Sequence, residues 1–288
     1  MSKVILITGT SSGVGLHTAV HLAAQGNKVY ASMRDLSKKE DLENLAGLKN
    51  VSLEILQLDI QKNEEVEAAV NTIISKENRI DVLINNAGAG FIGTMEQTSM
   101  EEIHNTMDIN FYGPIRCMKA VLPFMRKQHA GHIINISSVG GLVGQPMNEI
   151  YCAAKFALEG LSESIATYME PYFGINVSII EPGGIITEFG NNIFKNLEKS
   201  GGIKKGAYEP LVNDYMDYRA SFTDEMKAKA FQTPDQIAEL ISSCIADKKP
   251  ALRYLSSENA EKFTYLKSGL DTSGNHLQAM IRKNILNK

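Results

Sequence analysis

The sequence has few cysteines, no long apolar run and little excess charge of either sign. Its three cysteines, Cys117, Cys152 and Cys244, lie far apart, and no CxxC motif or His/Cys cluster is present. This pattern indicates no metal site and favours reduced thiols in a cytoplasmic protein. Cys152 is expected to be a buried helix cysteine rather than a nucleophile, since no histidine lies between positions 133 and 275.

The absence of long apolar stretches also argues against membrane insertion. The apolar run before Thr8 is too short for a signal-peptide core, and no other run is long enough to span a bilayer. A net charge of −4 gives no reason to expect nucleic acid or an anionic membrane as a partner. Hydrophobic content of 43% and charged content of 22% are typical of a globular protein.

Short apolar runs alternate with amphipathic stretches along the first 180 residues. Continuous apolar runs are typical of strands that are buried on both faces of a parallel sheet. The predicted strands are Lys3–Thr8, Lys28–Met33, Val51–Leu58, Ile80–Asn85, Gly131–Ser137 and Ile175–Glu181, and the predicted helices are Val14–Gln25, Asn63–Lys76, Met100–Lys127 and Glu149–Tyr172. The alternation predicts an α/β fold, a Rossmann-type doubly wound parallel sheet of about seven strands with helices on both faces.

The residue composition of the chain changes after Pro182. Residues 190–232 are rich in Lys, Asn, Tyr and Gly and have weak periodicity. A helix is predicted to start at Thr233-Pro234, with Thr as N-cap, and a short strand to follow at Ala251–Leu255. Without a linker or internal repeat, we expect a single domain over residues 1–288 with an inserted segment at 188–232.

The stretch TGTSSGVG, residues 8–15, lies between the first predicted strand and a predicted helix. Glycines there permit a tight turn, and the free N–H groups of a helix N-terminus attract a pyrophosphate. The spacing G-x-x-x-G-x-G differs from the G-x-G-x-x-G of most dinucleotide loops. A cofactor loop is the favoured interpretation, and a plain tight connection is the alternative.

The end of the second predicted strand bears on the choice between NAD and NADP. Asp35 has the spacing of an acid that binds a ribose 2′-hydroxyl, but Arg34 precedes it and could pair with a 2′-phosphate. Met33 occupies the terminal strand position, and the Ser12 hydroxyl could also reach the phosphate. We favour NADP(H), with NAD(H) and a solvated Arg34 as the alternative.

Further motifs follow in order: LDI (58–60), NNAG (85–88), Asn110 in DINF, Ser138 in ISSVGG, YCAAK (151–155), and EPGG (181–184) with Thr187. As a set, over residues 4–188, they resemble the short-chain dehydrogenase/reductase family. VYASMRDL, SSVGGLVGQPMNEIYCAAKFALEGLSES and PALRYLSSE are similar to its NADP(H)-preferring hydroxysteroid and retinol dehydrogenases. The family commonly forms homodimers or homotetramers through the helices that flank the active site.

The resemblance implies a catalytic role for four residues. Tyr151 would be the general acid in reduction and the base in oxidation, and Lys155, on the same helical face, would lower its pKa. Ser138 would hold the substrate oxygen, and Asn110 would bind a water of a proton relay. The alternative interpretations are an exposed tyrosine, a strand-end serine and a buried helix asparagine.

The resemblance also implies a cofactor site at the carboxyl ends of the strands. Asp59 would contact the adenine, Thr187 the carboxamide and Lys155 the nicotinamide ribose, while Asn86 could equally tie strand ends together. The full predicted set is Gly9, Ser11, Ser12, Gly13, Val14, Gly15, Arg34, Asp59, Ile60, Asn86, Ala87, Gly88, Tyr151, Lys155, Pro182, Gly183, Ile185 and Thr187.

The expected function is an NADP(H)-dependent oxidoreductase that acts on a secondary alcohol, ketone or aldehyde. Residues 142–149 and 188–232 would select a bulky apolar substrate through Phe189, Phe194, Tyr208, Leu211, Tyr215, Met216, Tyr218 and Phe222, although these could instead be helix packing. Steroid-specific relatives use a histidine in this region, and this chain has none there. A non-catalytic, NADP(H)-sensing binding protein with the same fold is the alternative.

Overall fold

The computed structural model describes residues 2–187, 202, 206–267, 280, 283 and 284. Its centre is a seven-stranded sheet with the order β3-β2-β1-β4-β5-β6-β7, in which all neighbouring strands are parallel. The strands are β1 Val4–Thr8, β2 Lys28–Met33, β3 Glu54–Gln57, β4 Val82–Asn85, β5 Gly131–Ile136, β6 Ile175–Glu181 and β7 Arg253–Leu255. The predicted fold class is therefore confirmed.

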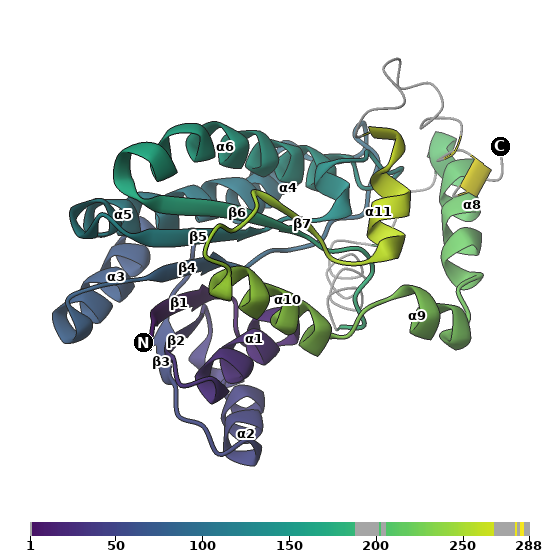
Figure 1. The fold of residues 1–288 in the computed structure, drawn as a ribbon. Coiled ribbons are helices and arrows are strands. Elements are labelled where there is room, and N and C mark those ends of the chain that lie inside the picture. Colours follow the sequence, from purple (N-terminus) through teal and green to yellow (C-terminus); the bar gives the residue numbers. More distant parts are fainter. Residues whose placement is uncertain (1, 188–201, 203–205, 268–279, 281–282, 285–288) are drawn as a thin grey trace.

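Helices cover both faces of the sheet (Figure 1). One face carries α1 (Gly13–Ala24), α2 (Glu40–Leu48) and α10 (Pro234–Ala246), and the other carries α3 (Asn63–Glu77), α5 (Gly113–Gln128) and α6 (Glu149–Phe173). Along β1, Ile5 and Ile7 pack into the first core while Val4 and Leu6 pack into the second. Because side chains alternate along a strand, a strand covered on both faces needs a continuous apolar run.

The strand order reverses beside β1, which pairs with β2 on one side and with β4 on the other. In doubly wound sheets, ligands bind beyond the carboxyl ends of the strands at such a switch point. The loops that follow β1 and β4 are therefore the place where this rule puts a ligand.

The prediction of one continuous helix over Met100–Lys127 is wrong for the middle of that segment. The segment consists of α4 (Met100–Met107), a π-helical turn at Asp108–Tyr112, and α5. Pro114 at the start of α5 has no N–H to continue the ladder, while the Gly113 N–H bonds Asp108 O in the wider π pattern. Asn110 consequently lies in the π turn, where such bulges often mark functional positions.

Several shorter elements also differ from expectation. The helix α2 was not predicted, because only Leu42 and Ala46 of its nine residues are buried. The strands β3 and β7 are shorter than the predicted Val51–Leu58 and Ala251–Leu255. The start of α10 is as predicted, with a capping box formed by Thr233 and Gln236.

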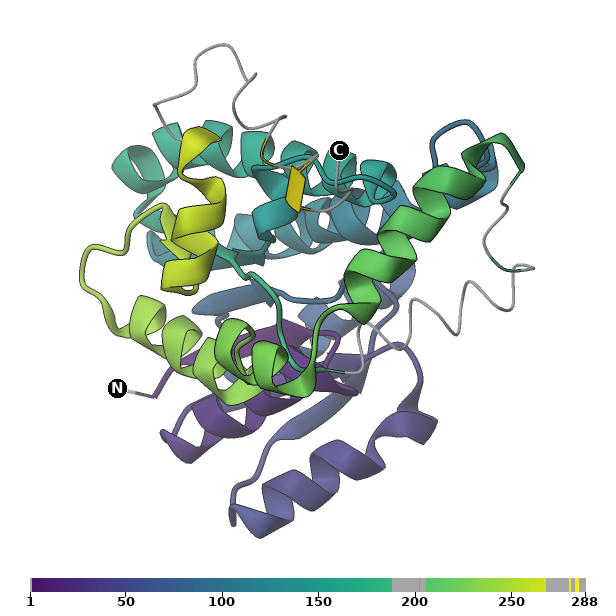
Figure 2. The same cartoon turned by 90° about the vertical axis from the view of Figure 1, so that its right-hand side faces the viewer.

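The segment after β6 contains two helices in the part that the structure describes. It contains α8 (Glu209–Ala220) and α9 (Asp224–Ala230), and α11 (Glu258–Thr264) follows β7. These helices lie beyond the carboxyl ends of the strands, beside the predicted site (Figures 1 and 2). The predicted lid residues Phe189 and Phe194 fall outside the described residues.

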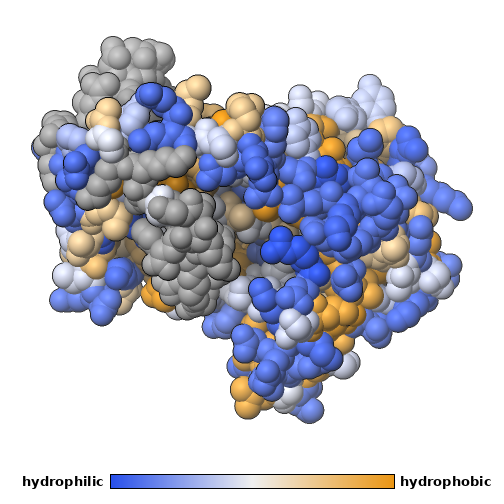
Figure 3. All heavy atoms as spheres, turned by 180° about the vertical axis from the view of Figure 1, so that it is seen from behind, coloured by the Kyte–Doolittle hydropathy of each residue, from blue (hydrophilic) through white to orange (hydrophobic). Residues whose placement is uncertain are grey.

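The surface fits the globular character expected from composition. Viewed from behind, hydrophilic residues predominate, and apolar side chains show between them in the lower half of that face (Figure 3). Among the described helices, none is long and apolar enough to cross a bilayer.

Truncation of the central strand tests this account of the core. Leu83 on β4 is 0% exposed and packs in the second core. We expect Leu83→Ala to lower the free energy of unfolding by about 2–5 kcal/mol, measured by urea denaturation. The matched change Leu48→Ala, at a side chain that is 83% exposed, should stay within about 0.5 kcal/mol of the unchanged protein. Equal effects of the two changes would contradict the packing described here.

Candidate active site

The backbone after β1 touches the backbone after β4. Gly9 has a φ of +72°, and a Cβ at this position would lie 2.7 Å from the Cα of Ala87. A Cβ on Gly15 would lie 2.3 Å from the carbonyl oxygen of Gly9 and 2.4 Å from Nδ2 of Asn86. The glycines of TGTSSGVG are thus required by close approach as well as by turn conformation.

The N-terminus of α1 faces the crevice at the switch point. The helix begins at Gly13, and the side chain of its N-cap residue Ser12 makes no capping hydrogen bond. Thr187 lies beside this end, with Cγ2 3.5 Å from the position of a Cβ on Gly13. Backbone N–H groups and the helix dipole at this end fit an anion such as a dinucleotide pyrophosphate.

Asn86 ties the two loops together. Its Nδ2 donates to the carbonyl oxygens of Thr8 and Gly9, both at 2.9 Å. The Thr8 hydroxyl in turn accepts from the N–H groups of Asn86 at 3.1 Å and Ala87 at 3.0 Å. The structural role considered for Asn86 is therefore observed, and Thr8 is a participant that the motif comparison did not single out.

The end of β2 carries an exposed arginine and an acid that is hydrogen-bonded to the turn that follows. Arg34 is exposed directly after Met33, which is 1% exposed. Asp35 accepts hydrogen bonds from the N–H of Ser37 at 3.0 Å and from its hydroxyl at 2.7 Å. The bonds with Ser37 lower the pKa of Asp35, so this carboxylate caps the following turn.

The neighbouring predicted cofactor residues at the end of β3 have structural partners. Asp59 accepts from the N–H of Gln61 at 3.1 Å, and its own N–H donates to Glu65 at 2.9 Å. The side chain of Ile60 is buried under α5, where a Cβ on Gly113 would lie 2.6 Å from its Cδ1. Asp59 is partly exposed, whereas Ile60 can offer only backbone to a ligand.

Tyr151 and Ser138 meet where β5 ends and α6 begins. Ser138 follows β5, and its hydroxyl accepts the N–H of Gly140 at 3.0 Å. Burial raises the pKa of the Tyr151 phenol to about 12, while a hydrogen bond with Ser138 acts in the opposite direction. The protein side chains alone therefore do not produce the lowered pKa expected for Tyr151, because desolvation dominates.

Lys155 lies one helical turn from Tyr151, and its ammonium is buried. Its Nζ is 5.7 Å from the centre of the Tyr151 ring and donates to the carbonyl oxygen of Ile136 at 2.9 Å. Burial lowers the pKa of Lys155 to about 8, and the charge of Glu159 opposes this shift. The expected closeness of Tyr151 and Lys155 is thus present.

Asn110 and Gly88 border the same space. A Cβ on Gly88 would lie 3.1 Å from Oδ1 of Asn110 and 3.7 Å from Nζ of Lys155. The Asn110 Nδ2 donates to the carbonyl oxygens of Ala89 at 2.9 Å and Thr106 at 3.0 Å. Its Oδ1 accepts the N–H of Ala89 at 3.2 Å. Asn110 therefore anchors the loop after β4 to the π turn.

The EPGG segment closes the site from the end of β6. The Pro182 carbonyl accepts the N–H of Val139 at 2.9 Å, which joins this segment to the turn after Ser138. Gly183 donates its N–H to the Ser256 hydroxyl at 3.3 Å, and Ile185 forms an isolated bridge with Gln232. The structure thus brings together the loops after β1, β4, β5 and β6, as predicted.

An apolar cluster joins the segment 142–149 to α8. Its buried members are Ile92, Val143, Met147, Val212 and Tyr215, and its partly buried members include Leu142, Tyr208, Leu211 and Tyr218. Met216 is 39% exposed, and Phe222 packs edge-on against Tyr218 with ring centres 5.1 Å apart. Helix packing therefore accounts for several of the predicted lid residues.

Cys152 is buried, as expected. Its Sγ lies 3.8 Å from the carbonyl oxygen of Val143, and burial raises the pKa of the thiol to about 11. Such a thiol stays protonated at neutral pH and is a poor nucleophile.

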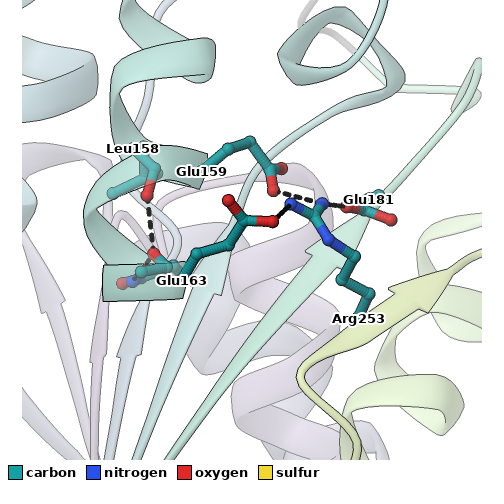
Figure 4. Close-up of polar contacts among 7 residues, drawn as sticks. Leu158, Glu159, Glu163, Glu181 and Arg253 are labelled. Carbon is teal, nitrogen blue, oxygen red and sulfur yellow. Dashed lines mark hydrogen bonds and ion pairs between the residues drawn. The ribbon is translucent and has the colours of Figure 1, made fainter. Parts of the chain in front are cut away.

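Sequence reasoning missed a charged cluster behind the site. Arg253 on β7 lies among Glu159 and Glu163 of α6 and Glu181 of β6 (Figure 4). The signal available in the sequence was Glu181 at the end of an otherwise apolar strand run, since a charged group there needs a partner.

The family model described as short chain dehydrogenase matches residues 3–198. Estradiol 17-beta-dehydrogenase 1 of Rattus norvegicus is 38% identical over 289 residues, covering 98% of this chain and 81% of the relative. Retinol dehydrogenase 8 of Bos taurus is 38% identical over 276 residues, covering 94% of this chain and 86% of the relative.

Solved structures give the same result. A short-chain dehydrogenase from Streptomyces avermitilis has a TM-score of 0.78 at 30% identity, covering 96% of this chain and 95% of that one. ElxO with NADP bound has a TM-score of 0.70 at 27% identity, covering 89% of this chain and 98% of that one. The chain therefore belongs to the short-chain dehydrogenase/reductase family. It is an NAD(P)-dependent enzyme acting on CH–OH groups, and it is similar to the hydroxysteroid and retinol dehydrogenases of that family.

Adding a methyl group at Gly15 tests the close contact between the loop after β1 and the loop after β4. Gly15→Ala forces the Cβ against Gly9 and Asn86, so we expect a loss of about 1–3 kcal/mol in unfolding free energy. Gly160→Ala, at an exposed position of α6 with no heavy atom within 4 Å of the new Cβ, should instead gain up to about 1 kcal/mol. Chemical denaturation distinguishes the two, and a stabilised Gly15→Ala protein would contradict the close approach.

Proposed function

We propose that this protein is an NADP(H)-dependent oxidoreductase that interconverts a bulky apolar secondary alcohol and its ketone, or reduces an aldehyde. The observation that carries the proposal is the hydrogen bond between Tyr151 and Ser138 with the Lys155 ammonium one helical turn away. A phenol, a hydroxyl and a buried cation at the carboxyl end of a doubly wound sheet suit proton transfer to a carbonyl oxygen. When bound, the nicotinamide cofactor supplies or accepts the hydride.

Each side chain has a distinct task in this scheme. Ser138 donates a hydrogen bond to the substrate oxygen, and Tyr151 delivers the proton to it in reduction or removes it in oxidation. Lys155 holds a positive charge beside the phenol and favours the phenolate. Asn110 keeps the loop after β4 and the π turn in place around Lys155 and would hold a relay water.

Cofactor binding in this proposal uses the crevice between the loops after β1 and β4. The first turn of α1, with the loop residues before it, would bind the pyrophosphate, while Asp59 would meet the adenine. The residues assigned to the cofactor are Gly9, Ser11, Ser12, Gly13, Val14, Gly15, Arg34, Asp59, Ile60, Asn86, Ala87, Gly88, Tyr151, Lys155, Pro182, Gly183, Ile185 and Thr187. The choice of NADP(H) is supported by the exposed Arg34 after β2, by the engagement of Asp35 with Ser37, and by the NADP bound in ElxO.

A bulky apolar substrate is supported by the cluster that joins residues 142–149 to α8. Estradiol and retinol appear in the names of the two curated relatives, and both are large apolar alcohols. We propose that residues 188–232 complete the substrate side, within a single domain.

A homodimer or homotetramer in the cytoplasm remains part of the proposal. Phe156, Tyr168 and Tyr172 of α6 are 37%, 42% and 74% exposed, which gives that helix apolar surface for a second copy. The alternative function, a non-catalytic NADP(H) sensor, gives no chemical reason for a phenol hydrogen-bonded with Ser138 beside a buried lysine.

Removal of the phenolic hydroxyl tests the chemistry. We expect Tyr151→Phe to lower kcat/KM for NADPH-dependent reduction of a panel of apolar ketones and aldehydes by at least about 100-fold, because the proton donor is lost. NADPH binding, followed by quenching of cofactor fluorescence, should persist. Tyr168→Phe on the exposed face of the same helix is the control and should retain activity. Full activity of Tyr151→Phe would refute the mechanism, and NADPH binding without turnover in the wild type would favour the sensor.

Cofactor choice is tested at Arg34. We expect wild-type protein to bind NADPH more tightly than NADH, and Arg34→Ala to weaken NADPH about 10-fold while leaving NADH unchanged, since a charge-assisted hydrogen bond is lost. Lys127→Ala, at an exposed cation on α5, controls for a general change in charge. Tighter binding of NADH by the wild type would overturn the assignment.

A further inference from the structure

One arginine serves three carboxylates behind the proposed active site (Figure 4). The Arg253 Nη1 contacts both Glu159 Oε2, at 2.5 Å, and Glu181, while Nη2 contacts Glu163 Oε1 at 2.6 Å. The Glu159 and Glu181 side chains are 5% and 0% exposed, whereas Glu163 is 54% exposed. Two buried acids thus depend on a single guanidinium nitrogen.

Two adjacent carboxylates in a buried site do not readily carry two charges, so the pair is expected to retain one proton. Glu181 is the more deeply buried, and among the described residues its Oε2 has no hydrogen-bond partner. Burial, followed by the charge of Glu159, raises the pKa of Glu181 to about 7. Burial raises the pKa of Glu159 as well, while the Arg253 guanidinium opposes that shift; because Glu181 is the more deeply buried of the two acids, the shared proton is assigned to Glu181.

The two buried acids of this cluster each adjoin a residue of the proposed active site. Glu159 lies one helical turn after Lys155, and Glu181 directly precedes Pro182. The Ser137 side chain, next to Ser138, lies beside Glu159. The contact is tight, because a Cβ on Gly141 would lie 2.6 Å from Ser137 Oγ and 3.0 Å from Glu159 Oε1. The cluster therefore links α6 to β7 and to the end of β6, beside residues of the proposed site.

On the basis of the proposed function, we propose that Glu159 is a positioning residue for catalysis. Its carboxylate keeps Lys155 charged and joins α6 to β7 through Arg253, while Glu181 carries the proton that the pair shares. The charged or titratable groups around Glu159 are Lys155 and Glu163 on α6, Glu181 on β6, Arg253 on β7, and Glu261 and Lys267 at the rim of the adjoining cleft of about 480 Å³.

The consequence is a specific change in the pH profile of reduction. The pKa of Lys155 is lowered to about 8 and that of Tyr151 is raised to about 12, so Lys155 loses its proton first as pH rises. The charge of Glu159 raises the pKa of Lys155, and its removal lets burial lower that pKa further. We expect Glu159→Gln to move the alkaline limb of kcat/KM to lower pH by about one pH unit. The KM for NADPH should change little.

Matched variants separate this role from a purely structural one. Glu163→Gln removes the exposed partner of the same arginine and should leave the pH profile unchanged. Glu159→Asp keeps the charge and should restore the alkaline limb, and Glu181→Gln, which mimics the protonated acid, should retain it. Lower activity in Glu159→Gln with an unshifted profile, or an equal shift in Glu163→Gln, would overturn the proposal.

A second measurement does not depend on turnover. Because the pKa of Glu181 is raised to about 7 in the folded state, the native protein binds more protons than the unfolded chain below that pH. Its unfolding free energy should therefore fall as pH rises from about 4.5 to about 7, relative to Glu181→Gln, which cannot titrate. A flat difference between the two proteins would refute the shared proton. Should the wild type show this difference but reduce no carbonyl compound, the proposed function fails while the shared proton stands.

Discussion

The contact between the backbone after β1 and the backbone after β4 is the constraint on which the site depends. In a doubly wound parallel sheet, ligands bind beyond the carboxyl ends of the strands, where the loops that follow different strands lie side by side. Gly9 and Gly15 remove the side chains that would hold these two loops apart, and Asn86 then bonds across the junction. Because the crevice is built from backbone, its shape does not depend on a flexible side chain.

Desolvation sets the chemistry of the groups that line this edge. Burial raises the pKa of Tyr151 and lowers that of Lys155, so each group is displaced toward its neutral form. A phenolate and an ammonium placed together can offset this cost for each other. The Lys155 ammonium donates a hydrogen bond to the carbonyl oxygen of Ile136, which supports the charged lysine without neutralising it.

Much of this arrangement could be predicted from the sequence because it follows from local patterns. Continuous apolar runs predicted the strands of the sheet, helical spacing put Tyr151 and Lys155 on one face, and the family resemblance added Ser138 to them. The π turn was missed because Asn110 lies in an unbroken amphipathic pattern, and only the missing N–H of Pro114 interrupts the ladder. The helix α2 buries too little apolar surface to leave a periodic signal.

The charged cluster was missed for a different reason, since its members are brought together only by tertiary structure. Glu159 and Arg253 are 94 residues apart, and neither stands in a motif that signals an ion pair. Of the cluster, only Glu181 left a signal in the sequence, because it is an acid that ends a buried strand. An acid at that point is costly unless another group compensates it, and β7 supplies the guanidinium. The last strand of the sheet thus balances charges that α6 and β6 bring together.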